Sequence, residues 1–194
     1  MTPTPGRLER VINNQVEIFK STDRRGSVAI ALSGTDQDEV ATNFIYDSIS
    51  EYEAHQDGVL GDTVRLSGID TRGADCVRTS WALARVIEPA VRPSRPKYIR
   101  RNLITAKPGE LGNLVNVLKE LREVFTTVTP GIAVQLGGNN DTVRTLIVVS
   151  SMEEFEAYSD ELASDKTKTY RDRVAGMIVG QHSVLSRFVH VNQS

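Results

Sequence analysis

The sequence contains nearly the same phrase twice, DSISEYEAHQDG at 47–58 and SSMEEFEAYSDE at 150–161. Both copies carry the pattern S-x-x-E-[YF]-E-A, which begins at Ser48 and again at Ser151, an offset of 103 residues. A serine followed three positions later by a glutamate is the capping-box pattern of a helix start. The aromatic residue that follows each glutamate can face a core. The repeated phrase therefore predicts two equivalent helix starts, with structural and not catalytic glutamates.

Four more pairs of segments recur in the same order at offsets of 103 or 104 residues. TPGRL at 4–8 matches KPGEL at 107–111, VAIALSG at 28–34 matches IAVQLGG at 132–138, VATNFIYDS at 40–48 matches VRTLIVVSS at 143–151, and SWALARV at 80–86 matches SVLSRFV at 183–189. Two unrelated α/β segments of similar composition are the alternative. Matches that keep one order favour a tandem duplication of a single structural unit.

Each half predicts the same succession of elements. A Pro-Gly pair opens a helix, a hairpin follows, the capped helix comes next, and a strand closes the half. The expected hairpin strands are 27–32 with 40–47, and 132–136 with 142–150; the closing strands are 77–87 and 183–191. A further helix is expected at 167–178, whereas the corresponding 61–74 is rich in Gly and Asp and looks looser.

The second half also has an opening strand at 98–106, which completes a ferredoxin-like β-α-β-β-α-β unit. Only residues 1–3 precede Thr4-Pro5, so we expect the first half to lack this strand. The predicted domains are a first repeat at 1–88, a proline-rich connector at 89–97 and a second repeat at 98–194. This is an α+β chain. Packing its two sheets together would hide both uncovered faces in an intrachain α+β barrel.

Composition excludes several classes of protein. A net charge of −2 and a pI near 6.0 give no basic footprint for nucleic acid. The single cysteine, Cys76, excludes an intrachain disulfide and a cysteine-based zinc cluster. No long apolar run or signal peptide is present, so we expect a cytoplasmic protein without a membrane span. The basic run 92–101 is interpreted as a solvated linker, or as a phosphate- or carboxylate-binding patch.

The order of these elements resembles the dimeric α+β-barrel superfamily, which includes antibiotic-biosynthesis monooxygenase-like, EthD-like and NIPSNAP-type domains. The resemblance rests on the x-P-G before the first helix, the hairpin, the Ser before S-x-x-E-[YF]-E-A, and GQHSVLSRFVHV at 180–191. It implies a barrel that usually forms between two chains and here would form within one. Members include cofactor-independent oxygenases, haem-degrading enzymes, decarboxylases and dehydratases. Trp81 and the histidines do not match the haem-pocket motif, so no cofactor is predicted.

His182, at the start of the last expected strand, is the candidate catalytic residue, because a histidine at a barrel mouth can act as a general base. A strand-end histidine that bonds to a loop is the alternative. His182 and His190 would be about 26 Å apart along the strand, and no cluster has the spacing of a metal site. His55 is expected to be a solvated surface residue.

Trp81, Tyr46, Asn43 and Arg85 are the candidate substrate-binding residues, since a few polar groups among apolar walls typically orient a small ligand. Trp81 as core filler is the alternative. Arg100 and Asn102 would project into the same cavity or lie on an exposed edge.

The sequence has no phosphate-cradling loop and no serine-hydrolase elbow. It therefore predicts a protein that binds or oxidises a small organic molecule in a pocket between the two sheets, like a cofactor-independent monooxygenase. The alternative is a non-catalytic self-assembly module with a filled barrel. Such a module would form a homo-oligomer through the sheet edge that the missing first strand leaves uncovered.

Overall fold

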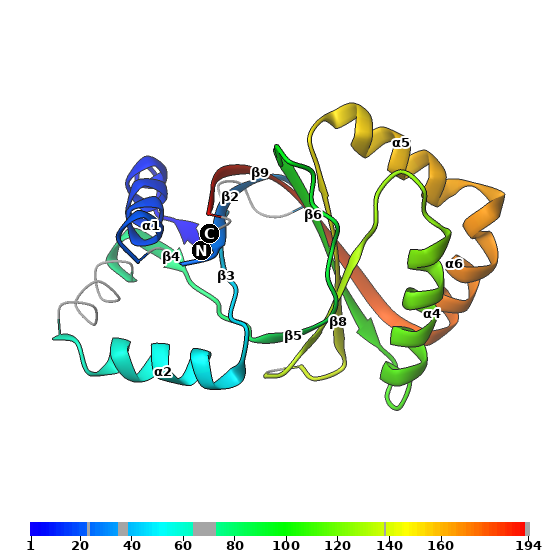
Figure 1. Cartoon of the computed structure of the whole chain (residues 1–194), viewed down its shortest axis with the longest axis horizontal. Helices are drawn as coiled ribbons and strands as arrows, with labels where there is room; N and C mark the ends of the chain where they lie inside the picture. The colour runs from blue at the N-terminus through cyan, green and yellow to red at the C-terminus, as the bar shows by residue number, and fades with distance from the viewer. Residues whose placement is uncertain (23, 35–38, 64–72, 138, 193–194) are drawn as a thin grey trace. The chain divides into compact units, whose positions relative to one another are not determined.

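A computed structural model of the chain describes residues 1–22, 24–34, 39–63, 73–137 and 139–192 (Figure 1). The chain forms two compact units. Unit 1 comprises Met1–Ser80 and Phe188–Ser194, and unit 2 comprises Trp81–Arg187. These boundaries follow the pairing of strands and differ from the boundaries of the sequence repeats. The chain enters unit 2 before the first repeat has ended, and its last residues return to unit 1.

Unit 2 has the predicted ferredoxin-like order of elements. They are β6 (Tyr98–Ala106), α4 (Leu111–Val124), β7 (Gly131–Gln135), β8 (Thr142–Val149), α5 (Met152–Ala163), α6 (Asp165–Met177) and β9 (Ile178–Asn192). The strands lie in the antiparallel order β9-β6-β8-β7. Figure 1 shows the three helices on one side of this sheet. The expected strands at 98–106, 132–136 and 142–150 and the expected helix at 167–178 are confirmed.

Unit 1 repeats this order in a reduced form. Its elements are β1 (Thr2–Pro3), α1 (Leu8–Thr22), β2 (Gly26–Ser33), β3 (Val40–Phe44), α2 (Ile49–Leu60) and β4 (Cys76–Arg78). β1 pairs with β4, and β2 pairs with β3. Met1 exchanges two backbone hydrogen bonds with Val40, at 2.9 and 2.8 Å, which places β1 beside β3.

The opening strand that the sequence did not predict for the first half is therefore present as β1. It has two residues, Thr2 and Pro3. The looser stretch expected at 61–74 lies largely outside the described residues.

The last strand of each half differs most from expectation. The predicted strand 77–87 is wrong as a single element: it breaks into β4 in unit 1 and β5 (Ala84–Glu88) in unit 2, with no regular structure between them. β5 pairs with β7, with Val86 directly opposite Ala133. β9 is long enough to serve both units: it pairs with β6 in unit 2, and from Phe188 onward it belongs to unit 1, where it neighbours β2. Each half thus gives its last strand to the sheet of the other.

The core of unit 1 lies between α1 and the β2–β3 hairpin. Its buried members are Val11, Phe19, Val28, Val40 and Cys76. A Cβ atom at Gly26 would lie 2.5 Å from the Phe19 ring and 2.1 Å from the Asn43 carbonyl oxygen. Glycine at the start of β2 is therefore what lets Phe19 pack against the sheet.

The core of unit 2 lies between α4 and the sheet. Leu114, Val117, Leu118 and Leu121 recur at helical spacing and are all buried. No helix in the described ranges is both long and apolar enough to cross a bilayer.

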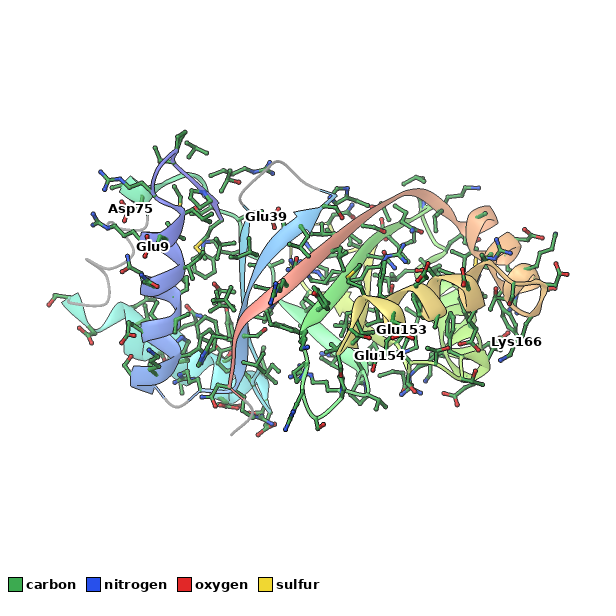
Figure 2. The ribbon with its side chains drawn as sticks, turned by 90° about the horizontal axis from the view of Figure 1, so that it is seen from above. Glu9, Glu39, Asp75, Glu153, Glu154 and Lys166 are labelled. Carbon is green, nitrogen blue, oxygen red and sulfur yellow. The ribbon has the colours of Figure 1, made fainter. Side chains whose placement is uncertain are left out.

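Both repeated phrases form helix caps, as predicted. The Ser48 hydroxyl accepts a hydrogen bond from the Glu51 backbone N–H at 3.1 Å, and Ser151 accepts one from Glu154 at the same distance. Each glutamate carboxylate accepts in turn from the backbone N–H of the residue before the serine, at 2.7 Å. Figure 2 shows Glu154 at the start of α5. The repeated glutamates are thus structural.

Glu161 joins the loop after α4 to the junction of α5 and α6. Its carboxylate accepts hydrogen bonds from the backbone N–H and hydroxyl groups of Thr126 and Thr127, at 2.8 to 3.1 Å, and from the Lys166 ammonium at 3.0 Å. Burial raises the pKa of this carboxyl group, but these hydrogen bonds outweigh burial and lower the pKa from 4.5 to about 2. The folded state therefore favours the carboxylate.

Replacement of the cap serine should destabilise the protein without changing its fold. We expect Ser151→Ala to lower the free energy of unfolding by about 1 kcal/mol, because the N–H of Glu154 loses its partner. Ser151→Asp keeps an acceptor and should retain most of the stability. Urea denaturation of the three proteins measures the difference, and equal stability of all three would contradict the cap.

Glu161 should make stability depend on acid pH. Its depressed pKa means that its contribution is present above about pH 4.5 and is lost as the pH falls toward 2. We expect Glu161→Gln to cost about 2 kcal/mol at pH 7 and progressively less in acid. Urea denaturation at several pH values measures this difference.

Glu156→Gln, at an exposed position of the same helix, is the matched control and should change little. A cost of Glu161→Gln that stays constant from pH 7 to pH 2 would contradict the account.

Candidate functional site

Strand alternation assigns every side chain of the unit 2 sheet to one of two faces. Ile104 and Val143 pack with Leu114 and Leu118 of α4, so their side chains lie on the face that the helices cover. Their chain neighbours Leu103 and Arg144 therefore lie on the opposite face. We call this second face of the unit 2 sheet the helix-free face.

One row of the helix-free face crosses all the strands of the unit 2 sheet. From β5 to β9 its members stand directly opposite one another in the order Val86, Ala133, Arg144, Leu103, His182. Arg144 and His182 flank Leu103, and two strand spacings put their Cα atoms about 10 Å apart. The row therefore places a guanidinium and an imidazole on either side of an apolar residue.

The sequence suggested that His182 lies at the start of its strand. The structure shows that it does not. β9 begins at Ile178, so His182 lies within the strand, opposite Leu103, and is exposed. His182 therefore lies on the helix-free face and not at a strand end.

The surroundings of this row are largely apolar. The side chains of Ile99, Val148 and Val184 belong to the same face and are buried. Arg101 also lies on this face and donates a hydrogen bond to the hydroxyl of Ser186 at 3.3 Å. Burial lowers the pKa of Arg144, and its Nε atom is buried with no hydrogen-bond partner among the described residues.

Trp81 and Arg85 do not join His182. Trp81 precedes β5 in the irregular stretch and is 72% exposed, so the alternative of a core residue is wrong. Arg85 stands opposite Val134, which pairs with Val143, so it lies on the helix-covered side of the sheet and is exposed there.

Asn43 and Tyr46 both belong to unit 1. The Asn43 amide donates to the Ser27 hydroxyl at 3.4 Å, on the face of the hairpin away from α1. Tyr46 follows the end of β3 and packs against α2, with ring centroids 5.4 Å from Tyr52 and 5.7 Å from His55. The four predicted substrate-binding residues are thus divided between the units, with Asn43 and Tyr46 in unit 1 and Trp81 and Arg85 in unit 2.

Unit 1 contains an aromatic cluster that the sequence did not predict. His55 contacts Tyr46 and Phe44, and Phe44 stacks on Phe19 with ring centroids 4.7 Å apart. Arg24 lies over the Tyr46 ring at 5.9 Å. Burial raises the pKa of the Tyr46 phenol, although Arg24 opposes the shift, so the phenol is neutral at pH 7.

His55 is therefore half-buried against aromatic rings, and the expectation of a solvated histidine is wrong. The equivalent residue of the second half is Tyr158, which is buried against Phe125 with ring centroids 4.9 Å apart. The sequence did contain a signal for this cluster. Positions 44, 46 and 52 are all aromatic, whereas of the equivalent positions 147, 149 and 155 only the last is aromatic.

Arg100 and Asn102 lie on the helix-covered face of β6, a central strand, so they occupy neither an exposed edge nor the helix-free face. Asn102 donates to the Thr145 hydroxyl at 3.1 Å and accepts from Ser183, while Arg100 donates to Ser183 at 3.3 Å. These groups form a polar layer between two apolar clusters of unit 2. Their hydrogen bonds are made within the fold, which indicates a structural role.

Within the described ranges, no three histidine, cysteine, aspartate or glutamate side chains gather as a metal site would require. The helix-free face, with its arginines and one histidine, offers instead positive charge and a titratable base. It can hold an anion and accept a proton.

No protein-family model matches the sequence, and no curated protein matches it either. Solved structures do match. An anthrone oxidase-like protein is 16% identical with a TM-score of 0.71, covering 100% of this chain and 91% of that chain. A candidate monooxygenase from Fusobacterium nucleatum is 10% identical with a TM-score of 0.72, covering 98% and 89%. Another from Lactobacillus acidophilus is 8% identical with a TM-score of 0.65, covering 96% and 89%.

At these identities the similarity establishes the fold. The resemblance found in the sequence is confirmed at that level: this chain is a tandem pair of ferredoxin-like repeats with the fold of monooxygenase-like proteins.

Proposed function

We propose that this protein binds a small organic molecule against the helix-free face of unit 2 and oxidises it with molecular oxygen. The observation that carries the proposal is the exposed His182, set in a row with Arg144 on a largely apolar face. The similarity over nearly the whole chain to solved structures described as an anthrone oxidase-like protein and as monooxygenases supports it.

His182 supplies the base. A neutral imidazole accepts protons in the physiological pH range, and general-base catalysis of this kind contributes about 10²–10⁴-fold to a rate. The proton comes from an activated C–H or O–H group of the ligand that rests on Leu103. The ligand is left as an electron-rich anion.

Arg144 stabilises that anion. A fixed positive charge in an apolar environment stabilises developing negative charge more strongly than it would in water. It stands beside Leu103 on the side away from His182. A ligand lying across Leu103 can therefore reach both groups.

Molecular oxygen then accepts the electrons. For a methylene carbon between two aromatic rings, as in an anthrone, the overall reaction is R₂CH₂ + O₂ → R₂C=O + H₂O. Two C–H bonds break, the carbon loses four electrons and dioxygen gains four, one oxygen atom entering the ketone and the other leaving as water. This stoichiometry needs no external reductant.

A non-catalytic, self-associating module is the second candidate. The observation that favours it is the exposed apolar surface at the edge of the unit 2 sheet, where Trp81 and Val86 are 72% and 61% exposed. A dimer in sedimentation that dissociates in Trp81→Ser, together with the absence of oxidation, would favour this candidate over the first.

Turnover should depend on His182. We expect the protein to oxidise an anthrone in air, and His182→Gln to lower kcat/KM by about 10²-fold or more, because the base is lost. Oxygen consumption and the absorbance of the quinone product measure the rate.

Gln181→Ala is the matched control. Gln181 is exposed, adjoins His182 and stands opposite Ile104 on the other face, so its removal should leave the rate unchanged. A rate no higher than that of buffer, or full activity of His182→Gln, would contradict the proposed function.

A further inference from the structure

Arg144 carries a charge that the fold does not neutralise. It stands in the middle of β8, between Ala133 and Leu103 of the neighbouring strands. No hydrogen bond or ion pair from any described residue reaches its guanidinium, and the Nε atom is buried. Burial disfavours the charged form of this group, which lowers its pKa.

Two other arginines of unit 2 donate hydrogen bonds within the fold. Arg122 donates to the Pro130 carbonyl oxygen at 2.9 Å and to Glu123 at 2.7 Å. Arg171 donates to the Ala163 carbonyl oxygen at 3.1 Å. Unlike these two side chains, the Arg144 guanidinium receives no hydrogen-bond acceptor from the described residues.

An unpaired charge in an apolar environment costs free energy. Removing an ion from water carries a penalty of several kcal/mol unless a counter-charge or hydrogen-bond acceptors compensate it. A methionine or leucine at this position would fill similar space without that penalty. The chain contains 25 acidic residues, yet none of the described ones pairs with Arg144. The guanidinium is therefore open to an anionic group from outside the chain.

We infer that Arg144 binds an anionic oxygen of the ligand, so that the site takes small aromatic molecules carrying a carboxylate or phenolate group. The location of the site rests on the proposed function, and the class of ligand is new. A guanidinium binds a carboxylate through two parallel hydrogen bonds, which fixes its orientation as well as its position.

The row then orders the ligand. With the anion at Arg144, the aromatic part lies over Leu103 and the reacting position faces His182. Ala133, on the other side of Arg144, has only a methyl side chain. Arg144 thus selects the ligand and sets its direction.

Binding of matched anionic and neutral probes tests the inference. Benzoate, 2-naphthoate and 9-anthracenecarboxylate are compared with their primary amides by titration calorimetry under nitrogen, so that no oxidation intervenes. We expect at least one acid to bind the wild-type protein ten times more tightly than its amide. Arg144→Met should remove this preference, Arg144→Lys should keep part of it, and Arg85→Met should leave it intact because Arg85 lies on the other side of the sheet.

Stability of the ligand-free protein separates binding from folding. We expect Arg144→Met to raise the thermal midpoint, because the uncompensated charge is gone. Addition of the bound acid should raise the midpoint of the wild type and not that of Arg144→Met. A lower midpoint for ligand-free Arg144→Met would show that the arginine stabilises the fold, and would overturn the inference. Equal affinity for every acid and its amide would also overturn it.

These outcomes are distinguishable from failure of the proposed function. Acid binding that depends on Arg144, in a protein that consumes no oxygen, would sustain the inference and contradict the oxidation. Oxidation that proceeds equally in Arg144→Met, and equally with neutral and anionic substrates, would sustain the proposed oxidation and contradict the inference about Arg144.

Discussion

The backbone pairing of β5 with β7 is the constraint on which the rest of unit 2 depends. An antiparallel sheet presents a row of unsatisfied N–H and C=O groups at each edge, and a strand from elsewhere in the chain satisfies them best. β5 belongs by sequence to the first repeat, yet it covers the edge of β7 in the second. β9 makes the reciprocal connection, because it runs on past Arg187 to become a neighbour of β2. A duplicated chain has thus become two units that cannot be separated at the repeat boundary.

The same pairing positions the candidate site. The register sets Val86, Ala133, Arg144, Leu103 and His182 in one row, so a one-residue slip in any strand would turn its member of the row to the helices. Polar side chains on the two faces of the sheet differ in whether the fold supplies their hydrogen-bond partners. On the helix-covered face Asn102 and Ser183 bond to each other and to their neighbours. On the helix-free face no described residue pairs with Arg144, and this is the basis of the anion site that we propose.

Local features could be predicted from the sequence. The capping boxes, the Pro-Gly helix starts and the hairpins each depend on residues close in the chain, and the structure has them where the repeats predicted. The exchange of last strands could not be predicted, because the partner of a strand is decided by pairing over long sequence separations. The sequence of 77–87 has the pattern of a single strand. In the structure the stretch is broken, and β5 lies in unit 2.

The site was predictable only in part. His182 was identified, but its face depends on where β9 begins, which alternation alone did not fix. Arg144 lies in TVRTLIVV and resembles a solvent-facing residue of a half-buried strand. That its Nε atom is buried without a partner depends on the packing of the whole sheet. The aromatic cluster around His55 was missed for a similar reason, since its members come from α1, β3, α2 and β9.

Cross-linking of β5 to β7 tests the strand exchange most directly. In a Cys76→Ala background, Val86→Cys and Ala133→Cys would stand directly opposite each other on one face, at a separation that permits a disulfide after small adjustment. We expect this pair to oxidise rapidly and completely in the folded protein. Arg85→Cys with Ala133→Cys, on opposite faces of the sheet, should remain reduced. Equal oxidation of both pairs, or none at all in a folded protein, would contradict the pairing from which the row of the helix-free face is built.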